Sequence, residues 1–189
     1  MMIFFVFLVV ICLAIVDVKA SIEEDSLILH NRLRARHGVP HLKLSSSLCE
    51  ECHAHAVVIA KSQSLEHSAE DGNYTENIDA VLGNPLKTIQ KWYDEIQRYN
   101  FRMPSYSDQT SHFTAMIWKS SEWFGYGQAD DSNGKTYIVA RYTPAGNLEG
   151  HFRENVRKVK KVLRNKGIFL FVDFHILAIA QLIILLLSK

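Results

Sequence analysis

The chain has 189 residues, of which 48% are hydrophobic and 22% are charged, and its formal net charge at pH 7 is +1. This length is sufficient for one domain with a sizeable hydrophobic core. The near-neutral charge argues against a nucleic-acid-binding protein, because such proteins need a basic surface to neutralise phosphates. We therefore expect no nucleic-acid partner.

Residues 1–20 form an apolar run that carries Val18 and Ala20 at the positions a signal peptidase reads. The pattern predicts a cleaved signal peptide, residues 1–20, and a mature chain that begins at Ser21. No basic residue precedes the apolar run. An uncleaved membrane anchor is therefore the alternative interpretation.

Residues 168–187 form a second apolar run, close to the roughly 20 residues that cross the hydrocarbon core as a helix. Asp173 and His175 are unfavourable in lipid, so we expect the outer part of the run at the interface or against a partner. The run predicts a transmembrane helix. The alternative is a tail that packs on the domain.

A basic linker, residues 156–167, lies between the domain and this tail. Such a linker beside a membrane span normally stays cytoplasmic, whereas a cleaved signal peptide would place it in the lumen. We favour the lumenal arrangement because Asn73-Tyr74-Thr75 is an acceptor sequence for N-glycosylation at Asn73. The expected location is the secretory pathway, with the domain lumenal or extracellular and either membrane-anchored or secreted.

The mature chain keeps two cysteines, Cys49 and Cys52, too few for a disulfide framework. The stretch "CEECH" matches a haem-attachment pattern, and His55 nearby would also allow a metal cluster. However, every fourth residue from Leu48 to Ala60 is small or apolar, which predicts one buried helical stripe. We interpret Cys52 as a core residue and expect no haem.

Three amphipathic helices are predicted before residue 100. The first begins at Leu27, in the run "LILHNRLRARHGVP", and ends at Gly38, a residue suited to a left-handed helix end. The second begins with Ser47 and Glu50 in capping-box spacing. The third covers residues 84–99, with Asn84 as its cap and a proline at its first position.

Two aromatic and β-branched runs follow, "WFGYGQA" and "TYIVARY", separated by a segment that contains Asn133-Gly134. This dipeptide suits a tight hairpin turn. Helices followed by a hairpin predict an α+β fold in one domain, residues 21–155.

Six motifs occur in the order and at about the spacing of the CAP superfamily of cysteine-rich secretory, antigen 5 and pathogenesis-related proteins. They are "HNRLRARHGVPHLKL", "LEHS", "TENI", "WYDEIQRYNF", "HFTAMIWKSS" and "YIVARYTPAGN". The resemblance covers residues 25 to 155, and the Golgi-associated plant pathogenesis-related subgroup is the most similar. It implies an α-β-α sandwich with a small antiparallel sheet between helices. Thr75 replaces a glycine of that subgroup, and the chain lacks the subgroup's amino-terminal lipid-attachment signal.

The resemblance also implies a central cleft lined by a tetrad: His67, Glu76, Glu95 and His112. Two neutral imidazoles and two carboxylates suit Zn²⁺ or a similar divalent ion, with His67 and His112 as ligands and the carboxylates orienting each ring. Glu95 lies at the margin of the apolar stripe of the third helix, so we expect it to have a cationic or hydrogen-bonding partner. A lone histidine beside apolar residues, as His112 is without the other three, is more often a hydrogen-bonded structural residue than a ligand or catalyst.

The resemblance implies, as the favoured function, a non-catalytic binding protein that engages lipid, sterol or a membrane surface, and a protein receptor or a second copy. One alternative is a secreted or shed immune-modulating or toxin-like receptor ligand. Another is a metal-dependent hydrolase using water held by His67 and His112. A serine hydrolase is disfavoured, because Ser111 and His112 are neighbours in sequence and their side chains are not expected to meet. We therefore assign no catalytic residue.

Overall fold

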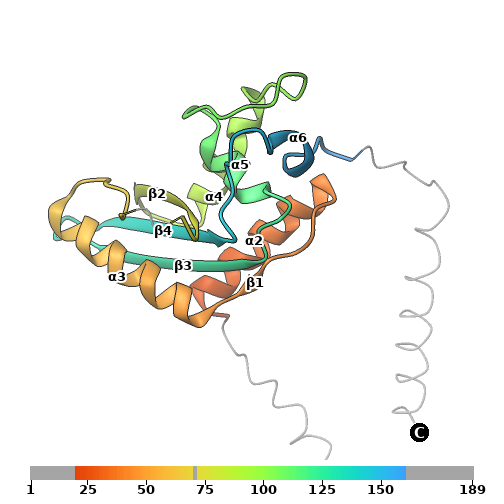
Figure 1. Ribbon diagram of the computed structural model, residues 1–189. Helices are drawn as coiled ribbons and strands as arrows, with labels where there is room; N and C mark the ends of the chain where they lie inside the picture. The colour runs from red at the N-terminus through yellow and green to blue at the C-terminus, as the bar shows by residue number, and fades with distance from the viewer. Residues whose placement is uncertain (1–19, 70–71, 161–189) are drawn as a thin grey trace, which may run out of the picture. The chain divides into compact units, whose positions relative to one another are not determined.

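The computed structural model describes residues 20–69 and 72–160 (Figure 1). The elements in chain order are α2 (Ile22–His37), β1 (Lys43–Leu44), α3 (Ser46–Ser62), β2 (Thr75–Leu82), α4 (Lys87–Asp94), the 3₁₀ turn η1 (Glu95–Gln97), α5 (Ser111–Ile117), β3 (Trp123–Asp130), β4 (Lys135–Thr143) and α6 (Phe152–Asn155). Among the described residues, no helix is long and apolar enough to span a membrane. Residues 1–19 of the predicted signal peptide and the predicted tail, 168–187, lie outside the described part.

One four-stranded sheet has the order β1-β3-β4-β2. Strands β2, β4 and β3 are antiparallel, and the predicted hairpin turn at Asn133-Gly134 joins β3 to β4. The sheet is mixed rather than purely antiparallel, because the two residues of β1 pair parallel to β3. The chain enters β1 from α2, and Lys43 and Ser45 donate their backbone N–H groups to the carbonyls of Glu122 and Phe124.

Helix α3 covers one face of the sheet at close range. A Cβ added at Gly127 of β3 would lie 2.1 Å from the backbone nitrogen of His53, and one at Gly125 would lie 2.6 Å from the backbone of Leu48. The two glycines therefore let the helix backbone lie directly on the strand. The stripe predicted from Leu48 to Ala60, including Cys52, is buried as expected.

Helices α2, α4 and α5 cover the opposite face, which gives the predicted α-β-α sandwich (Figure 1). The larger core cluster lies in this layer and is rich in aromatic rings. Its fully buried members include Trp92, Trp118, Phe113, Phe124, Tyr126, Tyr142 and Phe152.

The starts of the first two predicted helices differ from the structure. The cap of α3 is Ser45, not Ser47, and the Ser45 hydroxyl accepts from the Leu48 N–H. An N-cap residue needs an extended backbone, and the pairing of β1 with β3 gives that conformation to Ser45. Helix α2 ends at the left-handed Gly38 as predicted, but it begins earlier, at a capping box of Ser21 and Glu24.

The third predicted helix is shorter than residues 84–99. Asn84 caps a turn, since its side-chain oxygen accepts from the Leu86 N–H, and α4 begins at Lys87. The helix ends at Asp94 and tightens into η1, which carries Glu95. Glu95 therefore lies in a 3₁₀ turn rather than on the predicted helix face.

The folded part includes the first residues of the predicted linker. Val156 is buried, and the ring of His37 donates its Nδ1–H to the carbonyl of Arg157. The other ring nitrogen of His37 bonds to the Tyr93 hydroxyl at 2.9 Å. These contacts attach the end of the domain to the carboxyl end of α2.

The guanidinium of Arg34 is completely buried and bonds only to backbone carbonyls. It donates to Met116 and Trp118 at 2.9 Å, to Ser121 at 3.0 Å and to Pro40 at 2.8 Å. Burial lowers the pKa of Arg34 to about 10, so the side chain is still charged at neutral pH. It joins α2 to the end of α5 and to the approach to β3.

Replacing Arg34 with methionine should destabilise the domain by on the order of 3 kcal/mol, because three buried carbonyls and that of the exposed Pro40 would lose their donor. The matched control is Arg32→Met, an exposed arginine on the same helix, which should change stability by less than about 0.5 kcal/mol. Urea unfolding of the full chain in detergent micelles, followed by tryptophan fluorescence, measures both. Equal midpoints for the two variants would contradict the role given to Arg34.

Candidate functional site

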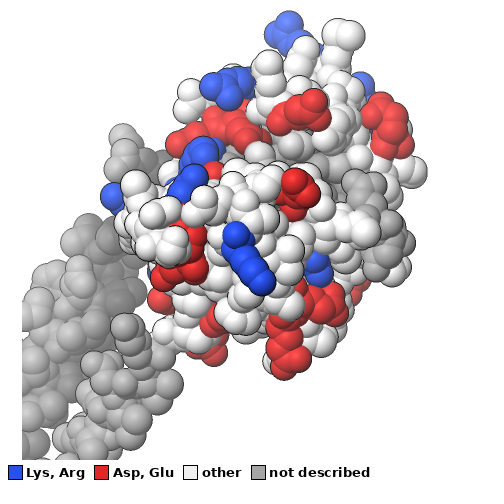
Figure 2. Space-filling view, turned by 90° about the vertical axis from the view of Figure 1, so that its left-hand side faces the viewer, with Lys and Arg blue, Asp and Glu red and all other residues white. Residues whose placement is uncertain are grey.

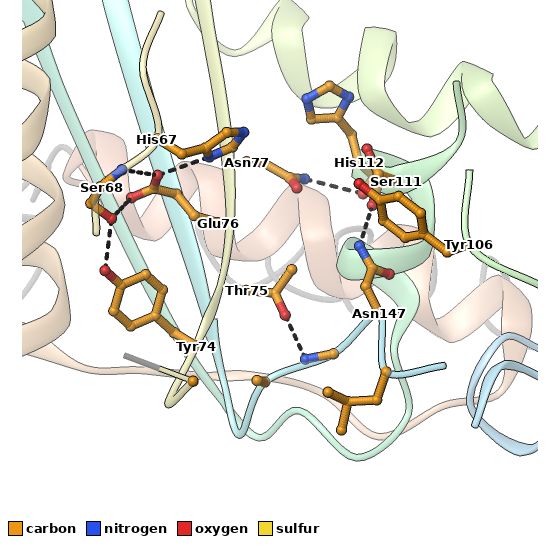
Figure 3. A pocket seen from close by; sticks show the side chains of 14 residues that line it. His67, Ser68, Tyr74, Thr75, Glu76, Asn77, Tyr106, Ser111, His112 and Asn147 are labelled. Carbon is orange, nitrogen blue, oxygen red and sulfur yellow. Dashed lines mark hydrogen bonds and ion pairs between the residues drawn. The ribbon is translucent and has the colours of Figure 1, made fainter. Parts of the chain in front are cut away.

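The predicted tetrad gathers around a pocket of about 370 Å³ beside the start of β2. His67, Glu76 and His112 line it directly, and Glu95 lies behind His112 and bonds to its ring. Figure 3 shows the His67–Glu76 pair on one side of the pocket and His112 on the other. The structure therefore brings the four residues together as two histidine–glutamate pairs.

The first pair is embedded in a hydrogen-bond network. His67 Nδ1 lies 3.0 Å from Glu76 Oε1, which also accepts from the backbone N–H of Ser68 at 3.1 Å. Glu76 Oε2 accepts from the Ser68 hydroxyl at 2.9 Å and from Arg141 Nε at 3.0 Å. Ser68 and Tyr74 share a further hydroxyl contact of 2.7 Å.

This network keeps Glu76 ionised. Burial alone would raise the pKa of the carboxyl, but hydrogen bonds from His67, Ser68 and Arg141 outweigh it and lower the pKa to about 2. An ionised carboxylate only accepts, so His67 Nδ1 must carry the proton that it donates. In the neutral ring, the lone pair available to a metal is then on Nε2.

The second pair is held by a helix and by packing. His112 Nδ1 lies 2.7 Å from Glu95 Oε1, and Glu95 Oε2 accepts from the Phe113 N–H at 3.1 Å. The imidazole stacks on Trp92 with 5.7 Å between ring centroids and 9° between planes. The expected hydrogen-bonding partner of Glu95 is thus confirmed. Asn77 Nδ2 donates to the His112 carbonyl at 3.1 Å.

The two pairs approach the pocket from opposite faces of the sheet. Glu76 bonds to Arg141, which also contacts Glu51 of α3, whereas the next residue, Asn77, bonds to α5 in the other layer. Consecutive strand residues point to opposite faces. Because β2 is an edge strand, both faces are accessible from its margin, and the pocket forms there.

The site offers two imidazoles to a metal ion. Within residues 20–69 and 72–160, no group of three or more His, Cys, Asp or Glu side chains is arranged to hold one. The histidines that could hold a metal ion in this cleft are His67 and His112, which both line the pocket. Ser111 lines the pocket, but its hydroxyl donates to the Asp108 carbonyl at 3.2 Å.

Three further residues of the site, Ser68, Asn77 and Arg141, were not predicted from the sequence. Of these, Arg141 had a usable signal, because it is the one charged residue within the otherwise apolar and aromatic core of β4, residues 137–142. A buried charge in a strand requires a paired carboxylate nearby. Ser68 and Asn77 had no comparable signal, since short polar residues next to motifs are common in loops and strand ends.

The charged side chains visible around the molecule carry both signs. On the face seen in Figure 2, Lys and Arg residues are interspersed with Asp and Glu residues. Recognition of an ionic ligand on this face therefore depends on individual side chains rather than on a field of one sign.

The fold and the paired cleft define a protein class that the comparisons identify. Residues 27–142 match the CAP family, the Cysteine-rich secretory protein family. The chain belongs to this family.

Among curated proteins, the chain is 43% identical over 138 residues to Golgi-associated plant pathogenesis-related protein 1 of Homo sapiens, covering 70% of this chain and 90% of that protein. It is 35% identical to Secreted protein RBT4 of Candida albicans, covering 64% of this chain and 34% of that protein. It is 28% identical to Pathogenesis-related protein 1A of Nicotiana tabacum, covering 68% of this chain and 78% of that protein. The chain thus spans nearly all of the human relative and about a third of the Candida one.

Solved structures share the fold. Venom allergen-like protein 4 of Schistosoma mansoni superposes with a TM-score of 0.58 at 17% identity, over 75% of this chain and 97% of that one. The crystal structure of NaASP2 with Zn²⁺ gives 0.56 at 18% identity, over 76% and 90%. Hookworm platelet inhibitor gives 0.52 at 28% identity, over 67% and 71%.

The lowered pKa of Glu76 predicts an acid-sensitive contribution to stability. The folded pKa of about 2 lies below the ordinary value of 4.5, so the contribution is complete above pH 4.5 and is lost as the pH falls toward 2. The wild type should have a larger free energy of unfolding than Glu76→Gln at neutral pH, and this difference should shrink across the window by at most about 3 kcal/mol. Urea unfolding at pH 7 and pH 3 measures the gap, and an equal gap at both would contradict the prediction.

Proposed function

We propose that the chain is a non-catalytic binding protein of the secretory pathway whose cleft binds a divalent ion such as Zn²⁺ through His67 and His112. One observation carries the proposal: both imidazoles line one pocket, and each holds a glutamate through its Nδ1. A carboxylate on one ring nitrogen fixes the tautomer and raises the basicity of the other nitrogen, which is the usual support of a zinc-binding histidine.

The donor chemistry fits zinc with an open coordination shell. Imidazole nitrogens are strong zinc ligands, but structural zinc sites have four protein ligands and catalytic sites have three. Two histidines predict a weaker site in which other positions are open to a ligand. The ion would supply a positive charge that attracts an anionic group, while the half-exposed side chains of Tyr106 and Leu148 offer an apolar surface at the same pocket.

We further propose lipid, sterol or an anionic membrane surface as the ligand class, together with a protein receptor or a second copy of the chain. Arg157, Lys158 and Lys160 are exposed where the described part ends, and basic residues near a membrane are attracted to anionic lipids. The apolar tail, residues 168–187, has the length of a membrane span. The names of the human and Candida relatives, Golgi-associated and secreted, fit this route.

A second candidate is a secreted or shed receptor ligand. The observation that favours it is the 28% identity to a protein named Hookworm Platelet Inhibitor. Release of the domain into the medium would favour this candidate over a membrane-anchored one. The metal-dependent hydrolase alternative is weaker, because catalytic zinc sites have three protein ligands and this cleft offers two histidines. A serine hydrolase is disfavoured further, because the Ser111 hydroxyl donates to a backbone carbonyl.

Expressed in eukaryotic cells, the full chain should begin at Ser21, lose mass on N-glycosidase treatment and stay in the membrane pellet after carbonate extraction. The signal peptide, the exposed Asn73 and the apolar tail motivate these three outcomes. The control variant Asn73→Gln should keep its mass on the same treatment. A chain that begins at Met1 and carries no glycan would contradict lumenal placement, and solubility in carbonate would contradict the anchor.

Zinc titrated calorimetrically into the full chain in detergent micelles should bind at one site. If the two imidazoles act as a unit, His67→Ala or His112→Ala should each remove most of the binding, and the double variant should add little. Affinity should fall in acid, because imidazole binds metal only when deprotonated. The exposed His41 is the matched control, and His41→Ala should bind as the wild type does. Unchanged zinc binding in the double variant would contradict the proposed site and would leave His112 as a hydrogen-bonded structural residue.

A further inference from the structure

The two histidine–glutamate pairs are supported in different ways. His112 lies in α5, its side chain is 28% exposed, and its ring is stacked on Trp92. His67 lies between α3 and β2, outside any helix or strand, and its side chain is 57% exposed. The His67 ring is therefore less enclosed than the His112 ring, and its hydrogen bond to Glu76 contributes more to its orientation.

The Glu76 carboxylate is one such contact, and its own orientation is fixed by Arg141. The strand register places Arg141 of β4 directly opposite Glu76 of β2. The guanidinium donates from Nε to Glu76 and from one terminal nitrogen to Glu51 at 3.2 Å. It also lies 4.2 Å from the centre of the Tyr74 ring, and the Arg141 side chain is 6% exposed.

This arrangement leaves the guanidinium little freedom. Arginine is planar and presents its N–H groups in a rigid fork, so two carboxylates and one aromatic face determine its plane. The fork and the Ser68 hydroxyl occupy Oε2 of Glu76, which turns Oε1 toward His67. The Glu95–His112 pair receives its support from the Phe113 N–H instead.

We infer that Arg141 is a positioning residue for the His67 half of the cleft alone: through Glu76 it fixes the ring orientation and tautomer of His67, and it leaves His112 unaffected. The inference about metal affinity rests on the proposed role of His67 as a ligand. The inference about the ring does not.

The test uses the full chain with ¹⁵N-labelled histidine in detergent micelles at pH 8. In the wild type, both rings should show the tautomer protonated at Nδ1. In Arg141→Gln, the His67 signals should move toward a mixture of tautomers while the His112 signals stay in place. The matched control is Lys91→Gln. It breaks the 2.6 Å ion pair with Asp79, which lies on β2 as Glu76 does, and it should move the signals of neither ring.

Zinc affinity gives the second readout. Loss of a group that orients a metal ligand typically lowers affinity by roughly 10- to 100-fold, and we expect about 10-fold for Arg141→Gln. Arg141→Lys keeps the charge but not the fork, so it should lie between the wild type and Arg141→Gln in both readouts. If Arg141→Gln does not fold, Arg141→Lys decides the matter by the same two measurements.

Unchanged His67 signals in these variants would overturn the inference. Equal movement of His67 and His112 would also overturn it, because that result would indicate a general disturbance of the domain. A wild type that binds no zinc would refute the proposed metal site, and the ring signals would still decide the role of Arg141.

Discussion

The buried guanidinium of Arg34 is the interaction on which the geometry of the cleft depends. Helix α5 has seven residues, too few to be stable alone. The carbonyls of Met116, in its last turn, and of Trp118, which follows the helix, accept from Arg34, and near its start the Phe113 N–H donates to Glu95. Charged groups from other elements thus satisfy both ends of the short helix that carries His112. The same carboxylate that completes the helix start also orients the imidazole of the cleft.

Helix ends that depend on the residue itself could be predicted from the sequence, whereas helix ends that depend on tertiary contacts could not. Gly38 ends α2 as expected because a left-handed backbone is intrinsic to that residue. Three consecutive serines, residues 45–47, could each have capped α3. The cap is Ser45, because pairing with β3 holds its backbone in the extended conformation that a cap needs. The early end of α4 has no local cause in the sequence. It coincides with the bonds that Glu95 makes to residues of α5.

The buried face of α2 shows why the supporting residues escaped a pattern-based analysis. Its buried residues are Ser26, His30, Leu33, Arg34 and His37, so polarity does not mark the face that enters the core. Arg32, Arg34 and Arg36 look equivalent in sequence, although only Arg34 is buried. The partners of Arg34 are backbone carbonyls, which no residue type reveals. The four tetrad residues, by contrast, could each be singled out in the sequence because each lies in a recognisable family motif.

The register of the edge strand joins these features into one site. Glu76 faces α3 and reaches His67, while the adjacent Asn77 faces the other layer and binds the backbone of His112. A one-residue slip of β2 against β4 would exchange these two faces and separate Glu76 from Arg141. The pocket therefore requires the register as much as it requires the tetrad. It follows that a chain could keep all four motif residues and still lose the cleft if the cross-strand pair of Glu76 and Arg141 no longer fixed the pairing.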